Sequence, residues 1–256
     1  MSDHPALICD LDGVIWLADQ AIAGAAEAIG ALRRSGSTVL FVSNNSFAPV
    51  ADVEGKLARF GIPARGDVLT SAHAAAQLVE PGERVFLCAG PGAAEALMAR
   101  GAVLVGSAPA DAVVVGFHRS FDYEELRRTA AVVRAGARLI GTNDDATYPT
   151  PDGPIPGGGA ILAAVAVGSG ATPAVAGKPY APMAALVRAR LGATTSHAVM
   201  VGDRPDTDGL FAVELGCRFG LVLSGVTRRG DLPVDPTPAL LAEDLADLAA
   251  QLMAGG

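Results

Sequence analysis

The chain has 256 residues, enough to bury a sizeable core as one large domain or two smaller ones. Half of the residues are hydrophobic, which excludes an intrinsically disordered chain, and a net charge of −8 argues against a nucleic-acid-binding groove. The first residues lack a basic signal-peptide segment and the apolar runs are too short to span a bilayer, so we expect a cytoplasmic protein without a membrane partner.

Strand-like and helix-like segments alternate in the first third of the chain. The strand-like segments are apolar and rich in β-branched residues, as in buried parallel strands, at 6–9, 38–43 and 67–71. The helix-like segments between them lie at 24–36, 48–61 and 72–79. This alternation predicts an α/β fold with a mostly parallel sheet.

A second alternation begins near residue 82. Its strand-like segments lie at 85–90, 111–117 and 138–143, and its helix-like segments at 93–101, 122–136 and 154–170. Asp122 and Glu125 have the spacing of a capping box at the start of the middle helix. From residue 175 the chain resumes the pattern of the first part, with segments at 181–192, 197–203, 208–216 and 219–225. The simplest organisation is a core domain formed by 1–81 and 175–256, interrupted by an inserted α/β domain at 82–174.

Two carboxylates follow the first predicted strand. Asp10 and Asp12 stand two residues apart, and Gly13 allows a sharp turn directly after them. Ligands bind beyond the carboxyl ends of the strands in an open parallel sheet, so Asp10 lies at a candidate site. Alone, the pattern also fits an ordinary turn or a structural calcium loop. Two neighbouring buried carboxylates are costly, so we expect a cation or a reacting group beside them.

Two further segments suit an anion. Ser43, Asn44 and Asn45 follow the second predicted strand, where hydroxyl, amide and N–H groups can hold a phosphate; a capped turn would use the same residue types. Lys178 stands between Gly177 and Pro179. It is interpreted either as a surface lysine or as a fixed counter-charge.

The last cluster is acidic. Asp203 ends a β-branched strand, and Asp206 and Asp208 follow within five residues. Acids are favoured at the start of a helix, and they are equally suitable as oxygen ligands of a hard cation.

Together these clusters fit phosphoryl transfer to an aspartate. A carboxylate attacks phosphorus, and Mg²⁺ offsets the repulsion between that carboxylate and the phosphate. A lysine and N–H donors stabilise the phosphoryl oxygens. A second carboxyl group protonates the leaving oxygen and later takes a proton from water.

The four segments, in this order, resemble the motifs of haloacid-dehalogenase-like (HAD) phosphatases. The matching stretches are DLDGVIW, FVSNNS, GKP and VGDRPDTD, and the resemblance covers nearly the whole chain. It is closest to the NagD-like, p-nitrophenylphosphatase and phosphoglycolate phosphatase subgroup, subclass IIA. The resemblance implies a Rossmann-like core with a parallel sheet, an inserted α/β cap of the C2 type between the second and third motifs, and Mg²⁺ as cofactor.

The resemblance also assigns roles to the motif residues. It implies that Asp10 is the nucleophile and a metal ligand, and that Asp12 is the general acid/base and binds the metal through its backbone carbonyl. It implies that Asp203 is the other metal carboxylate and that Asp208 contacts metal-bound water. The phosphate-binding residues that it implies are Ser43, Asn44, Asn45 and Lys178. Pro205 and Gly209 depart from the Leu and Ile that the family usually has at these positions.

The substrate is expected to be a small phosphorylated metabolite that the cap selects, and lid-to-lid homodimers are common in this subgroup. Tyr148 lies in a stretch that resembles the cap loop before the third motif, so we predict that it contacts the leaving group. Packing beneath the proline-rich loop is the alternative for Tyr148. His118 and Arg119 form a second candidate pair on the cap.

Two other functions compete with the phosphatase. A dehalogenase of the same superfamily would not need the acid at Asp12. A non-catalytic HAD-fold binding or regulatory protein would be expected to lose some of the motif residues, whereas Asp10, Asp12, Lys178 and Asp203 are all present.

Overall fold

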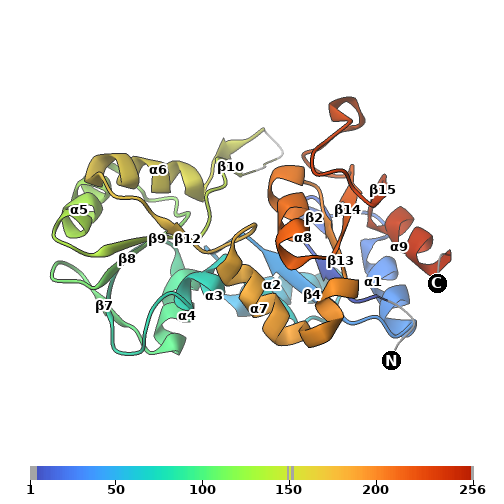
Figure 1. Cartoon of the computed structure of the whole chain (residues 1–256), viewed down its shortest axis with the longest axis horizontal. Coiled ribbons are helices and arrows are strands. Elements are labelled where there is room, and N and C mark those ends of the chain that lie inside the picture. The colour runs from blue at the N-terminus through green and yellow to red at the C-terminus, as the bar shows by residue number, and fades with distance from the viewer. Residues whose placement is uncertain (1–4, 149, 151–152, 255–256) are drawn as a thin grey trace.

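The computed structural model describes residues 5–148, 150 and 153–254. Two α/β domains lie side by side along the long axis of the molecule (Figure 1). The core domain contains a sheet with the strand order β15-β14-β13-β1-β4-β5, and every neighbouring pair is parallel. In chain order these strands are β1 (Leu7–Cys9), β4 (Val39–Ser43), β5 (Val68–Thr70), β13 (Val199–Gly202), β14 (Arg218–Val222) and β15 (Leu240–Ala242).

Helices cover both faces of the core sheet, because alternate strand residues point to opposite sides. Ile8, Val42 and Met200 belong to one apolar cluster, and Leu7, Phe41 and Val201 belong to the other. The first cluster is completed by α3 (Ser71–Ala76), α7 (Ala181–Leu191) and α8 (Leu210–Leu215). The second is completed by α1 (Ala25–Arg34), α2 (Val50–Arg59) and α9 (Leu245–Ala254). The strands are therefore buried on both faces, which explains their continuous apolar sequences.

The second domain, called the cap, has its own parallel sheet with the order β12-β9-β8-β6-β7. Its strands are β6 (Arg84–Cys88), β7 (Val103–Val105), β8 (Ala112–Val115), β9 (Arg138–Gly141) and β12 (Ala174–Val175), and its helices are α4 (Pro91–Arg100), α5 (Tyr123–Arg134) and α6 (Gly158–Ser169). Helices α5 and α6 pack together over one face of this sheet.

An apolar interface joins the cap to the core. Helix α4 packs against α3 of the core, and their buried residues belong to one cluster that includes Ala75 and Leu97. Gly90 lies against Phe47, where a Cβ atom would be 2.4 Å from the ring. This close packing holds the cap beside the carboxyl edge of the core sheet.

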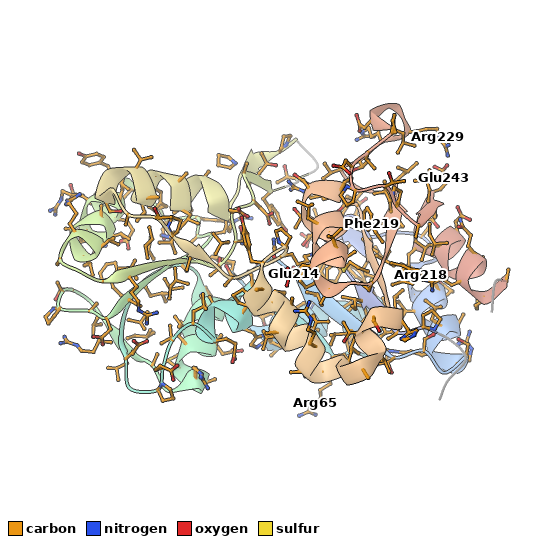
Figure 2. All side chains as sticks on the ribbon, in the orientation of Figure 1. Arg65, Glu214, Arg218, Phe219, Arg229 and Glu243 are labelled. Carbon is orange, nitrogen blue, oxygen red and sulfur yellow. The ribbon has the colours of Figure 1, made fainter. Side chains whose placement is uncertain are left out.

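Two short antiparallel hairpins complete the fold around this edge. The first, β2 (Trp16–Leu17) and β3 (Gln20–Ala21), follows β1 in the core; the second, β10 (Thr147–Tyr148) and β11 (Ile155–Pro156), belongs to the cap. The remaining short elements are η1 (Gly192–His197), η2 (Pro205–Gly209) and η3 (Arg229–Asp231). Figure 2 places Arg229, the ion-pair partner of Glu243, on the core side of the molecule, away from the cap.

The predicted fold class is confirmed. Asp122 caps α5 as predicted, with its Oδ1 accepting a hydrogen bond from the Glu125 amide at 2.8 Å. Cys9 and Cys88 are buried as free thiols, and Cys217 is partly buried. No helix within the described residues is long and apolar enough to cross a membrane.

The limits of the two domains stay a proposal. We propose the predicted division into 1–81, 82–174 and 175–256 with one change, because Val175 pairs with Gly141 in the cap sheet. The last residue of the cap is then Val175.

Candidate active site

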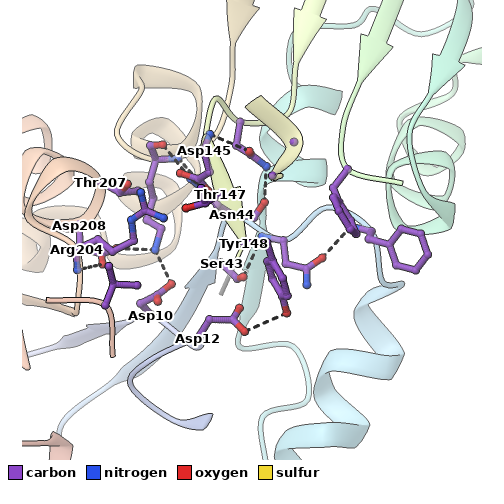
Figure 3. Close-up of a pocket in the computed structure, with 18 of the residues that line it drawn as sticks. Asp10, Asp12, Ser43, Asn44, Asp145, Thr147, Tyr148, Arg204, Thr207 and Asp208 are labelled. Carbon is purple, nitrogen blue, oxygen red and sulfur yellow. Dashed lines mark hydrogen bonds and ion pairs between the residues drawn. The ribbon is translucent and has the colours of Figure 1, made fainter. Parts of the chain in front are cut away.

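Three neighbouring strands bring the predicted site residues to one edge of the core sheet. Asp10 follows β1, Ser43 ends β4, and Asp203 follows β13. Because β1 lies between β13 and β4 and all three are parallel, their carboxyl ends meet at the same edge. Figure 3 shows Asp10 and Ser43 in the pocket that results.

Lys178 is the cation that the paired acids required. It follows β12, where the chain returns from the cap, and only 2% of it is exposed. Its Nζ lies 2.6 Å from Asp10 Oδ1 and 2.7 Å from Asp208 Oδ1. Burial by itself lowers the pKa of the lysine, but the two carboxylates outweigh it and hold the pKa above its usual range. Lys178 is therefore a fixed ammonium ion and not a surface lysine.

One lysine does not balance the carboxylates of this pocket. Oxygens of Asp10, Asp203 and Asp208 lie within 4.8 Å of one another, and all three residues are buried. Burial raises the pKa of Asp10 well above its ordinary value, which Lys178 partly opposes. Burial and the charge of Asp208 raise the pKa of Asp203 to about 7. A divalent cation would supply the missing positive charge, so this set of oxygen donors fits Mg²⁺.

The hydrogen bonds of the three acids show which of them have an oxygen free for a metal ion. Both oxygens of Asp208 are used inside the protein, because Oδ1 meets Lys178 and Oδ2 accepts from the Arg204 amide at 3.2 Å. Asp203 Oδ2 accepts from the Val226 amide at 2.6 Å, but its Oδ1 receives no hydrogen bond from the described residues. Asp10 Oδ2 is similarly free of donors within the described chain. Asp10 and Asp203 therefore have oxygens available to a metal, whereas Asp208 braces the lysine.

Glycine is required at two positions beside these acids. Gly13 has a φ of +83°, and a Cβ there would lie 2.3 Å from Asp203 Oδ2. Gly209 ends the η2 turn, where a Cβ would lie 2.8 Å from Pro236 Cγ. The departure at Gly209 thus has a packing reason: Pro236 fills the space that a larger side chain would need. Pro205 begins the same turn, a position that does not need an N–H donor.

Asn44 holds the Lys178 loop in place. Its Oδ1 accepts from the Lys178 amide at 2.8 Å, and its Nδ2 donates to the Lys178 carbonyl and to Asp145 Oδ2, both at 3.0 Å. Both amide hydrogens are thereby used within the protein. Ser43 Oγ accepts from the Asn45 amide at 3.0 Å, which shapes the same turn. Ser43, Asn44 and Asn45 all line the pocket.

Asp12 lies where the two hairpins meet. Its Oδ1 accepts a hydrogen bond from Trp16 Nε1 at 3.0 Å. The same oxygen accepts one from the Tyr148 hydroxyl at 3.3 Å, which Figure 3 shows. Trp16 belongs to the core hairpin and Tyr148 to the cap hairpin. Burial raises the pKa of the Asp12 carboxyl, although both donors oppose the shift. A carboxyl group with a raised pKa is suited to proton transfer near neutral pH.

The cap closes the pocket with aromatic and charged side chains. Phe117 and Tyr148 stack at 5.9 Å between ring centroids, and Phe47 of the core meets Phe117 edge-on. Arg119, one of the two candidates on the cap, lines the pocket. His118 does not, since its ring contacts Ser120, Cys88 and Phe121 within the cap. Of the two candidates, only Arg119 is thus placed to meet a substrate.

Several residues of the pocket were not singled out from the sequence. Asp145, Asn143, Thr147, Arg204 and Thr207 line it. Asp145 and Asn143 stand in the stretch that resembles the loop before the third motif, so that resemblance was a usable signal. Trp16, in the first matching stretch, donates a hydrogen bond to Asp12. Asp206 forms only an exposed ion pair with Arg204.

The sequence of this chain is similar to those of known phosphatases. Two family models match, "Haloacid dehalogenase-like hydrolase" over residues 7–103 and a HAD-hydrolase-like model over residues 175–248. An acid sugar phosphatase of Staphylococcus saprophyticus is 35% identical over 242 residues, which cover 93% of each chain. The chain belongs to the haloacid dehalogenase-like hydrolase family.

Solved structures of this family share the whole fold. The p-nitrophenyl phosphatase from Archaeoglobus fulgidus is 30% identical and superimposes with a TM-score of 0.90, covering 97% of this chain and 99% of the other. The glycerol phosphate phosphatase from Mycobacterium tuberculosis, solved in complex with magnesium, is 34% identical with a TM-score of 0.87, covering 96% of this chain and 76% of the other. The predicted family and its enzyme class, phosphoric monoester hydrolase, are confirmed.

Proposed function

We propose that this phosphatase hydrolyses small phosphorylated metabolites with Mg²⁺ and through an aspartyl-phosphate on Asp10. The observation that carries the proposal is the buried contact of Lys178 with Asp10, beside the donor-free oxygens of Asp10 and Asp203. A nucleophilic carboxylate, a fixed ammonium ion and a place for a divalent cation are the parts that this reaction needs.

In the first half-reaction, a carboxylate oxygen of Asp10 attacks phosphorus and the bond to the leaving oxygen breaks. The Lys178 ammonium stabilises charge on the phosphoryl oxygens and favours the ionised form of Asp10. Mg²⁺, held by Asp10, Asp203 and the Asp12 carbonyl, would reduce the repulsion between the nucleophile and the phosphate. The Asp12 carbonyl accepts no backbone hydrogen bond within the described residues, so it is available for this role.

Asp12 completes both half-reactions. It gives a proton to the leaving oxygen, and it then takes one from the water that attacks the aspartyl-phosphate. Ser43 and Asn45 hold the phosphate, whereas the side chain of Asn44 positions Lys178, so Asn44 meets the phosphate through its backbone. Asp208 acts chiefly on Lys178, with which it forms an ion pair.

The cap is proposed to select the leaving group. The named relatives act on sugar phosphates, glycerol phosphate and p-nitrophenyl phosphate, so the fold accepts several leaving groups. Tyr148, Phe117 and Arg119 of the cap line the pocket, and we propose that they contact the leaving group. A homodimer through the cap and a cytoplasmic location stay predictions.

The test is a screen of the purified protein against phosphate monoesters with and without Mg²⁺. We expect turnover of at least one small metabolite, loss of activity in a chelator, and recovery with Mg²⁺. Asp10→Asn should abolish turnover, because an amide is a poor nucleophile and carries no charge for the cation. Activity of Asp10→Asn at the wild-type level would overturn the mechanism, and full activity after complete chelation would overturn the metal dependence.

A further inference from the structure

Tyr148 is the only cap residue in the described chain that donates a hydrogen bond to Asp12. It is separated from Asp12 by 136 positions in the sequence, and it reaches the core from the cap hairpin β10–β11. We propose that Tyr148 is a positioning residue for the general acid: together with Trp16 it fixes which oxygen of Asp12 carries the transferable proton. This inference rests on the proposed function.

Two donors share one oxygen of Asp12. Trp16 Nε1 and the Tyr148 hydroxyl both point at Oδ1 of Asp12, and Oδ2 receives no hydrogen bond from the described residues. An indole N–H cannot accept a hydrogen bond, so a proton on Oδ1 would face the hydrogen of Trp16. The protonated form of Asp12 therefore carries its proton on Oδ2, and Oδ2 is the oxygen free to reach the substrate.

The donors are themselves held in place. Trp16 is buried, its ring lies 6.0 Å from that of Phe60, and the Lys56 ammonium stands 4.3 Å from its centroid. Tyr148 stacks on Phe117 of the cap. One donor thus belongs to the core and the other to the cap. The acid is fully oriented only when the cap lies as in this structure, which links substrate enclosure to proton transfer.

The proton balance of the step is simple. The O–H bond at Asp12 Oδ2 breaks as the proton passes to the bridging oxygen of the substrate. The P–O bond to that oxygen breaks with its electron pair going to the leaving group, and the phosphoryl group passes to Asp10. An alkyl leaving group needs this proton, whereas 4-nitrophenolate is stable without it.

The kinetic test compares Tyr148→Phe with a matched Tyr123→Phe control. Tyr123→Phe removes the same hydroxyl from a tyrosine that is 75% exposed on α5, outside the pocket. Because kcat/KM reports only steps up to departure of the leaving group, it isolates the acid role of Asp12. We expect Tyr148→Phe to lose about tenfold in kcat/KM for an alkyl phosphate, the value of one hydrogen bond to a carboxyl group, and less than about twofold for 4-nitrophenyl phosphate. Tyr123→Phe should change neither.

Equal losses for both substrates, or no loss for either, would overturn the proposal. A second readout does not depend on activity. Trp16 is the only tryptophan in the sequence, so its indole N–H gives a single NMR cross-peak. Since Trp16 and Tyr148 share one oxygen, Tyr148→Phe should shift this peak and Tyr123→Phe should not.

The kinetic and NMR measurements distinguish failure of this proposal from failure of the proposed function. An unmoved peak in Tyr148→Phe would refute the shared contact, whatever the activity. A shifted peak in a protein that hydrolyses no phosphate monoester would refute the proposed function while confirming the contact between the hairpins.

Discussion

Replacing Lys178 by methionine tests the electrostatic centre of the site. Methionine is similar in length, so the change removes the ammonium ion with little loss of packing. The substitution deprives Asp10 and Asp208 of the Lys178 ammonium, whose Nζ lies 2.6 Å from Asp10 Oδ1 and 2.7 Å from Asp208 Oδ1. Breaking a buried ion pair by removing one partner costs about 3–5 kcal/mol. Asp208 keeps its Arg204 amide donor and Asp10 borders the cavity, so we expect a value near the lower limit, about 3 kcal/mol.

The assay is urea unfolding of both proteins at pH 7 in a chelator, followed by far-UV circular dichroism. The unfolding midpoint should fall while the slope of the transition stays unchanged. Asp208→Asn in the Lys178→Met background should recover part of the loss, because it removes one uncompensated carboxylate. A loss below about 1 kcal/mol, the usual value for an exposed pair, would show that Lys178 is not a buried ion-pair partner of these acids. Lys178→Met should also lack phosphatase activity.

Three further changes test separate parts of the site. In metal-free protein the pKa of Asp203 is raised to about 7, so the stability that this carboxyl contributes is present below its unfolded pKa of about 3.9 and is lost as the pH rises through 7. Wild type should therefore have a lower urea midpoint at pH 8 than at pH 5. Asp203→Asn should reduce this difference between the two midpoints. Gly209→Ile should destabilise the protein by about 1–3 kcal/mol through overpacking against Pro236, as measured by the urea midpoint, and an unchanged midpoint would contradict the packing account. Asp12→Asn should lower kcat/KM for an alkyl phosphate by about a hundred- to ten-thousandfold with a much smaller loss for 4-nitrophenyl phosphate, and a uniform loss would argue against an acid role.

Much of the candidate site was predictable because its residues follow strands. Asp10, Ser43 and Asp203 each stand at or just after the end of an apolar run, and parallel strands bring such ends to one edge. The motif resemblance supplied Lys178, which no local pattern distinguishes from a surface lysine. The structure then adds what the sequence does not contain: both side-chain N–H groups of Asn44 donate to the Lys178 carbonyl and Asp145, so the side chain of Asn44 braces the lysine loop.

Contacts between distant hairpins were beyond sequence reasoning. The β2–β3 and β10–β11 hairpins have two-residue strands, too short for an alternating pattern to be recognised. The contact of Tyr148 with Asp12 depends on how the cap packs on the core through α3 and α4, and it connects segments 136 positions apart. Tyr148 was predicted to contact the leaving group, and it does line the pocket, but its hydrogen bond goes to the acid.

The C-terminal part of the core sheet was missed for another reason. Strand β15 (Leu240–Ala242) has only three residues, and α9 (Leu245–Ala254) follows after a two-residue gap. Between β14 and β15 the chain runs through a proline-rich segment, and Pro236 there packs against Gly209. Local sequence gives little sign that the sheet continues beyond such a segment.

Phosphorylation of Asp10 can be observed directly in the Asp12→Asn variant. With 4-nitrophenyl phosphate the first step needs no acid, whereas hydrolysis of the aspartyl-phosphate needs Asp12 as base. Rapid mixing should therefore release about one equivalent of nitrophenolate per enzyme in a burst, and mass spectrometry of the acid-quenched protein should find one phosphoryl group on the peptide that contains Asp10. Release of nitrophenolate without a burst, from a protein that never becomes phosphorylated, would contradict the account.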